Sequence, residues 1–189
     1  MKISRSSEYN KSSHFIIIAR KSADLSEFLS KEEIEFVKER IKKDKTEIFF
    51  NRLRQFVSIL LINDSENADY QLKEKLRKSA AKLGNSLNQL NVESVNLLHR
   101  NLECDMSLAF AEGLALSNYQ FLKYFKEKDK KKNSLEQLNI VCEKITDNDI
   151  EELRSHFYDL VDSLKEKGLS DDEAFLVAKK RLGENHEVK

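Results

Sequence analysis

The sequence predicts an α/β domain with a mixed sheet flanked by helices, followed by a C-terminal helical hairpin. Short β-branched runs alternate with longer segments in which apolar residues recur every three or four positions, as interleaved strands and helices do. The run Gln55–Ile62 is apolar on both faces, which is typical of a central strand covered on both sides. From residue 147 onward only helical patterns occur. We therefore expect an α/β domain at residues 1–146 and a two-helix segment at residues 147–189.

The first half of the domain predicts a strand, a helix and a hairpin. His14–Arg20 is a β-branched run bounded by polar residues, which indicates a buried strand. Ser30 and Glu33 have the spacing of a capping box, so a helix is expected over Lys31–Lys43. Two further strands follow, separated by a polar turn near Asn51–Arg54.

Helices and strands alternate regularly in the second half of the domain. We expect a long helix over Ala68–Leu90, a strand over Val92–Arg100, and a helix from Met106 to about Phe121 capped by Asp105. The last strand places three alternating residues inward: Leu138, Ile140 and Cys142. The order β-α-β-β-α-β-α-β predicts a layered domain.

The last segment predicts two helices. The first is expected over Asn148–Lys167 and to end at Gly168, which can adopt a positive φ without a Cβ clash. Ser170 and Glu173 are expected to cap the second helix, which runs to Arg181. A hairpin of this length rarely folds alone, so its apolar stripe should contact the α/β domain or a partner helix. The candidate interaction residues on that stripe are Phe157, Leu160 and Phe175.

Composition excludes several classes of function. The formal net charge is zero although 35% of the residues are charged, so the overall field does not favour nucleic acid. The four glycines are well separated, which argues against a phosphate-binding loop. The apolar runs are too short for a secretory signal or a membrane span, so no direct membrane insertion is expected. The two cysteines form no CxxC pair, and we predict that they stay reduced in the cytoplasm.

One block, LAFAEGLALSNYQFLKY at Leu108–Tyr124, contains Ala-Glu-Gly around Glu112. With LRKSAAKLGNSLNQLNVESVNLL at Leu76–Leu98 and the downstream strand, it resembles the N-terminal domain of cytosolic leucyl aminopeptidases. The likeness covers about residues 1–154 and implies a macro-domain-like α/β fold. Beyond about residue 155 the sequence departs from the family, which a natural fusion, a gene remnant or a chimera would each explain.

The resemblance also bears on Glu112. The family removes N-terminal residues from peptides with two divalent metals, zinc or manganese, held in a separate catalytic domain by the signature N-T-D-A-E-G-R-L. Around Glu112 the Asp and Arg of that signature are missing, and the context is an amphipathic helix. Two-metal hydrolysis needs several converging carboxylates. We therefore assign no catalytic, metal or cofactor residue, and expect Glu112 on a packed helix where Gly113 allows close backbone approach.

Three functions follow from these resemblances. The first is a non-catalytic structural or oligomerisation module with a protein partner or a second copy. The second is a macro-like domain that binds a nucleotide or ADP-ribose. The third depends on the tail, where "E-L-x-S-H-x-x-D-x-x-D-x-L-x-x-K-G-L-S" resembles a cytoplasmic helical segment of some bacterial permeases and sensors. That likeness implies a cytoplasmic partner of such a membrane protein.

Two other groups could carry chemistry. A basic run interleaved with Glu127 and Asp129 is a candidate interaction patch, although its composition favours a solvated loop; it comprises Lys126, Lys128, Lys130, Lys131 and Lys132. His99 and Cys104 could meet at a strand–helix junction as a zinc or Cys–His nucleophile site. Because no third ligand is evident, we interpret them as polar loop residues.

Overall fold

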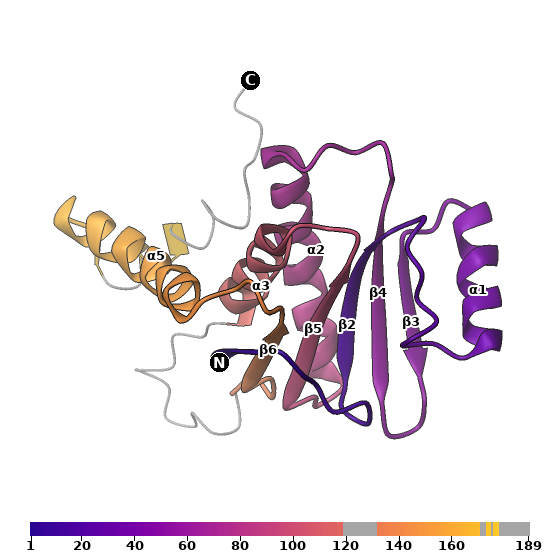
Figure 1. The fold of residues 1–189 in the computed structure, drawn as a ribbon. Helices are drawn as coiled ribbons and strands as arrows, with labels where there is room; N and C mark the ends of the chain where they lie inside the picture. The colour runs from indigo at the N-terminus through magenta and orange to yellow at the C-terminus, as the bar shows by residue number, and fades with distance from the viewer. Residues whose placement is uncertain (119–131, 171–172, 175, 178–189) are drawn as a thin grey trace.

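The computed structural model describes residues 1–118, 132–170, 173–174 and 176–177, with the side chains of residues 156–158, 160 and 161 left out (Figure 1). Six strands form one sheet in the order β1-β6-β5-β2-β4-β3. Their bounds are β1 Lys2–Ser6, β2 Phe15–Arg20, β3 Glu47–Asn51, β4 Phe56–Ile62, β5 Ser94–Arg100 and β6 Gln137–Val141. The helices are α1 Lys31–Lys42, α2 Tyr70–Gln89, α3 Cys104–Asn118 and α5 Asp147–Glu166 within the described residues.

The sheet is mixed, as the sequence predicts. All neighbouring strands are parallel except β3, which pairs with β4 in the antiparallel direction. Strand β1 was not predicted because its five residues, KISRS, are mostly polar. Only Ile3 among them is buried, so the signal of an edge strand rests on one side chain.

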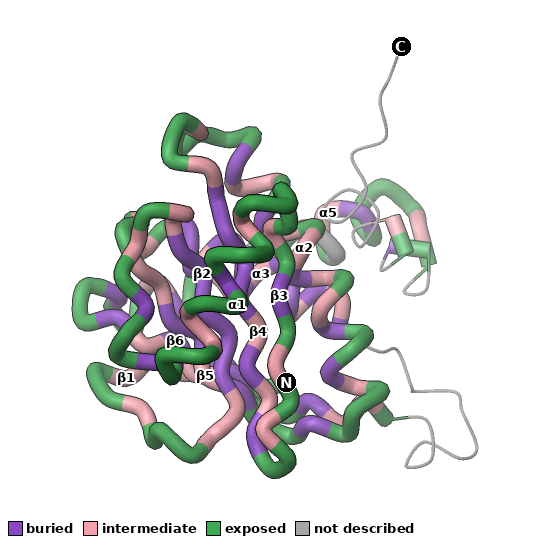
Figure 2. Tube along the Cα trace, turned by 90° about the vertical axis from the view of Figure 1, so that its right-hand side faces the viewer, coloured by how far each residue is buried: buried purple, intermediate pink, exposed green. Residues whose placement is uncertain are grey.

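The two faces of the sheet build two cores. Strand β4 shows the alternation: Val57, Ile59 and Leu61 pack on the face that α1 covers. Leu60 and Ile62 pack on the opposite face, with residues of α2 and α3. Figure 2 shows buried residues following the central strands. The prediction that this strand is covered on both faces is confirmed.

The local signals that the sequence predicts are mostly confirmed. The Glu33 amide donates to Ser30 Oγ over 3.3 Å, and the Ser30 amide donates to Glu33 Oε2 over 2.9 Å, which completes the capping box of α1. Gly168 follows α5 with a φ of +90°. The cap assigned to Asp105 is wrong, because α3 begins one residue earlier and Asp105 lies in its first turn. There it pairs with Lys73 of α2 at 2.9 Å.

Helices α2 and α3 approach each other at two glycines. A Cβ on Gly113 would lie 2.5 Å from the Cα of Arg77 and closer still to its carbonyl oxygen. A Cβ on Gly84 would meet the ends of two side chains, Ser117 Oγ at 2.8 Å and Leu114 Cδ1 at 2.9 Å. The prediction that Gly113 allows close backbone approach is therefore confirmed.

The first helix of the tail packs on the domain. Thr146 caps α5, and Arg5 of β1 pairs with Asp147 at 2.8 Å. Ile150 is buried in the core shared by α2 and α3, with Leu153 beside it. Further along, Leu164 and Ala174 form a small separate cluster with Leu169 and Val177.

The cap of the second tail helix is also present, since the Ser170 amide donates to Glu173 Oε2 over 2.9 Å. The candidate interaction residues Phe157 and Leu160 fall in α5, where their side chains are outside the described part, and Phe175 is outside it altogether. Among the residues that the structure describes, none of the helices combines the length and apolar character needed to span a bilayer.

Candidate functional site

The carboxyl ends of the parallel strands bring three potential ligands together: His99, Cys104 and Cys142. We call them the edge cluster. His99 is the penultimate residue of β5, Cys104 opens α3 directly after that strand, and Cys142 follows β6. The register of β5 and β6 pairs Leu97 with Ile140, so His99 and Cys142 each come two residues beyond that pair. Parallel pairing thus places residues 43 positions apart in sequence at one edge.

The distances within the edge cluster are short. Cys104 Sγ lies 3.8 Å from His99 Nε2, and the ligand atoms of all three residues fall within 4.8 Å of one another. The two cysteines are joined as a disulfide with Cα atoms 6.7 Å apart. The prediction that they stay unpaired is wrong for this structure. Sequence spacing gives no indication of the pair, because the sheet brings together cysteines that are 38 positions apart in the chain.

A buried hydroxyl orients the imidazole. Ser107 is fully buried on α3, and its Oγ lies 3.0 Å from His99 Nδ1. If the ring proton is on Nδ1, Ser107 accepts it and Nε2 directs its lone pair to Cys104. Ligating histidines are commonly held in this way, with the second ring nitrogen donating to a neighbouring oxygen.

The surroundings keep His99 neutral. Burial lowers its pKa below the ordinary value, and the positive charges of Arg100 and Lys144 lower the pKa further, whereas Glu103 opposes them. A neutral imidazole can offer a lone pair to a metal or accept a proton from a thiol. The lowered pKa of His99 therefore favours the imidazole form that has a lone pair at neutral pH.

A pocket of about 340 Å³ opens beside the edge cluster. Its wall includes Tyr9 from the β1–β2 connection, Phe28 from the segment before α1, and Arg100 and Lys144 from the strand ends. The carboxyl ends of the strands are where ligands bind in open α/β sheets, especially where consecutive crossovers leave in opposite directions. That point lies between β2 and β5 here, since β2 leads toward β4 and β5 leads toward β6.

Sequence reasoning found His99 and Cys104 but missed Cys142 and Ser107. The sequence does carry a signal for Cys142, because it is the last of the three inward-facing residues expected in its strand, and His99 is next to the end of the strand expected over Val92–Arg100. If those strands are parallel neighbours, their carboxyl ends coincide. Ser107 carried no comparable signal, since its hydroxyl matters only through the three-dimensional contact with the ring.

Glu112 is held by an ion pair between helices. Arg77 Nε of α2 donates to Glu112 Oε2 over 2.5 Å, and the two side chains are 18% and 12% exposed. Arg77 also reaches Glu74 Oε2 at 3.6 Å. An arginine is permanently cationic and competes with any metal for the carboxylate. These residues do not fit the two-metal centre of leucyl aminopeptidases.

Most of the basic run falls outside the described residues, namely Lys126, Lys128, Lys130 and Lys131. Lys132 is described and exposed, and its Nζ pairs with Glu136 Oε1 at 2.5 Å. That contact is local, four residues along the chain, and neutralises one charge of the run.

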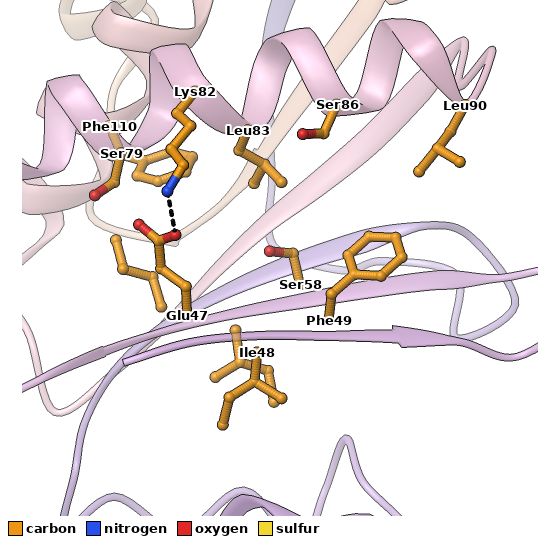
Figure 3. A pocket seen from close by; sticks show the side chains of 12 residues that line it. Glu47, Ile48, Phe49, Ser58, Ser79, Lys82, Leu83, Ser86, Leu90 and Phe110 are labelled. Atoms are coloured by element: carbon orange, nitrogen blue, oxygen red, sulfur yellow. Dashed lines mark hydrogen bonds and ion pairs between the residues drawn. The ribbon is translucent and has the colours of Figure 1, made fainter. Parts of the chain in front are cut away.

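A groove of about 360 Å³ runs between α2 and strands β3 and β4 (Figure 3). Figure 3 shows an ion pair across it between Glu47 of β3 and Lys82 of α2. Lys82 Nζ lies 3.0 Å from Glu47 Oε2. Phe49 and Leu90 line it, and both are large apolar side chains at least 40% exposed. The groove is therefore an apolar surface open to contact.

Comparison with known proteins identifies a similar fold but no matching family. No protein-family model matches the chain, and no curated protein matches it. A solved structure of a mutant tomato leucine aminopeptidase is similar, with a TM-score of 0.58 and 12% sequence identity. The match covers 85% of this chain and 36% of the tomato chain, so this chain spans about a third of that protein's length. At this identity the likeness shows a shared fold.

Proposed function

We propose that the chain is a non-catalytic α/β module of a leucyl-aminopeptidase-like protein, cytoplasmic, acting through protein contacts. The observation that carries the proposal is the fold likeness, which relates most of this chain to about a third of a leucine aminopeptidase. The sequence block at Leu108–Tyr124 supports it independently. The Arg77–Glu112 pair explains the Ala-Glu-Gly motif as packing chemistry.

The groove between α2 and β3 is the surface that we assign to contact with a second copy of this chain. The family resemblance implies a domain that helps to build an oligomer. Exposed apolar side chains in the groove lose contact with water on docking, and each contributes about 1–2 kcal/mol when fully covered. The Glu47–Lys82 pair across the groove would limit the partners that fit.

Sedimentation of the purified chain tests this assignment. We expect the mass to rise above 22.1 kDa with concentration, and Phe49→Lys to abolish the rise. Leu53→Lys is the matched control, because Leu53 is 95% exposed on the same hairpin and does not line the groove. A mass of one chain at every concentration would refute self-association.

The non-catalytic part of the proposal has its own test. The chain should release no leucine from a leucyl anilide with manganese or zinc supplied, because Glu112 is committed to Arg77. Metal-dependent turnover that co-purifies with the chain and is lost in Glu112→Gln would overturn it.

The pocket beside the edge cluster favours a second candidate, binding of a nucleotide or ADP-ribose. Arg100 and Lys144 line that pocket at the carboxyl ends of the strands and could face phosphate groups. Calorimetric titration with ADP-ribose tests it, with Arg100→Gln as the variant expected to weaken binding. A titration without saturable heat at millimolar ligand would reject this candidate. The permease or sensor partner of the tail stays a prediction.

A further inference from the structure

We propose that His99, Cys104 and Cys142 bind one zinc-like divalent cation in the reduced chain, and that closing the Cys104–Cys142 disulfide expels it. The proposal rests on the geometry of one histidine and two cysteines that come from two strand ends and a helix start. It stands apart from the proposed docking role, since the groove lies between α2 and β3 and shares no lining residue with the pocket at the cluster.

The geometry matches a Cys₂His site with an open position. Tetrahedral zinc with Zn–S of about 2.3 Å and Zn–N of about 2.0–2.1 Å places nitrogen and sulfur ligands about 3.6 Å apart. Cys104 Sγ and His99 Nε2 are already 3.8 Å apart. Two thiolates at the same ion would lie about 3.8 Å apart. A Cα–Cα separation of 6.7 Å lets the cysteine sulfurs reach that spacing by side-chain rotation.

A hydrogen-bonding partner that holds the histidine is also present. Ser107 Oγ, fully buried, lies 3.0 Å from His99 Nδ1, on the side of the ring away from Cys104. It fixes the ring so that Nε2 faces the sulfurs, which is the role that outer hydrogen bonds play at zinc histidines. The fourth position would open to the pocket of about 340 Å³, where water or a small ligand could complete the tetrahedron.

The exchange between the two states balances with a low-molecular-weight thiol as reductant. Two thiols reduce the Cys104–Cys142 bond: that S–S bond breaks, each cysteine sulfur gains one electron and one proton, and the small thiols leave as their disulfide. The cation then displaces one proton from each cysteine. In reverse, a small disulfide takes two electrons from the bound thiolates: its S–S bond breaks, the protein disulfide forms, and the cation is released. Two protons from water complete the two small thiols.

Titration of the reduced chain with Co²⁺ under inert gas tests the site directly. We expect one equivalent to bind, with sulfur-to-cobalt charge-transfer absorption and the visible bands of four-coordinate cobalt, and the oxidised chain to show neither. Adding Zn²⁺ should displace the Co²⁺. Equal spectra for reduced and oxidised chains would overturn the proposal.

Substitutions distinguish the proposed cation ligands from Ser107, which orients one of them. His99→Ala and Cys142→Ser should each weaken Zn²⁺ binding at least about 100-fold, and Ser107→Ala about 10–100-fold, as loss of an outer hydrogen bond does. Glu112→Gln is the control and should bind as the unaltered chain does. Unchanged affinity in folded His99→Ala would refute the assignment.

A measurement on the unaltered chain keeps the proposal testable if those variants fail to fold. Zn²⁺ should protect both cysteines of the reduced chain from alkylation by iodoacetamide, followed residue by residue by mass spectrometry. Adding oxidised glutathione to the zinc-loaded chain should release the ion, detected with a coloured chelator, as the disulfide forms. Alkylation rates that stay the same when Zn²⁺ is added would contradict the proposed site.

Discussion

Helix α3 contributes to two polar clusters that differ in what surrounds them. At its first turns, Cys104 and Ser107 meet His99 at the edge of the sheet, beside an open pocket. In its middle, Glu112 faces α2 and is held by Arg77. The first cluster holds an imidazole, a hydroxyl and two cysteines joined as a disulfide, so the cysteines could bind a cation only after reduction. The second cluster already contains a cation, the guanidinium group of Arg77. The Glu112 carboxylate therefore links two helices, although Ala-Glu-Gly also occurs in a catalytic signature.

Forcing α2 and α3 apart should have the largest effect on the cluster around Glu112. Gly113→Ala should cost about 3 kcal/mol of unfolding free energy, because its Cβ would overlap the backbone of Arg77, which cannot rotate away. Denaturant unfolding measures the cost. Gly84→Ala is the matched control, since its Cβ meets only side-chain ends and alanine gains up to about 1 kcal/mol of helix propensity. Equal costs would show that backbone contact is not the constraint.

The α2–α3 contact also shows what sequence could predict. The mixed sheet, the capping box of α1 and the role of Gly113 followed from local patterns, because periodicity and capping depend on near neighbours. Strand β1 did not, because its single buried residue gives no alternation to read. Predicting the edge cluster requires knowing that β6 and β5 are neighbours in the sheet, and that order is set by long-range pairing. Cys142 and His99 therefore looked unrelated in sequence.

A second prediction removes the charge of Glu112. Glu112→Gln should destabilise the chain by about 2 kcal/mol, because among the described residues Arg77 then keeps only Glu74, at 3.6 Å, as a charged partner in a largely buried interface. The matched control is Glu47→Gln, whose pair with Lys82 is more than half exposed and should cost less than about 1 kcal/mol. Thermal unfolding of both variants measures the difference. If Glu112→Gln changed Zn²⁺ affinity instead of stability, the distinction between the two clusters would fail.

The smallest effect concerns a third ion pair, which should behave like the Arg77–Glu112 pair. Hydrogen bonds from Arg52 lower the pKa of Glu33 below its ordinary value of 4.5, with Arg52 Nε donating to Glu33 Oε1 over 2.6 Å. Because the folded pKa is the lower one, the pair stabilises the chain above the unfolded pKa. That contribution disappears as pH falls through the folded pKa.

Arg52→Met tests this prediction by NMR titration of the carboxyl carbons. The pKa of Glu33 should rise, and the loss of stability on acidification should become less steep. Asp149 is the internal control, because its pKa is lowered by hydrogen bonds from Thr146 and should not respond. A Glu33 pKa that stays low without Arg52 would assign the shift to the Ser30 amide, which donates to the same carboxylate. The arginine would then matter for packing alone, and the rule drawn from Glu112 would not extend to this hairpin.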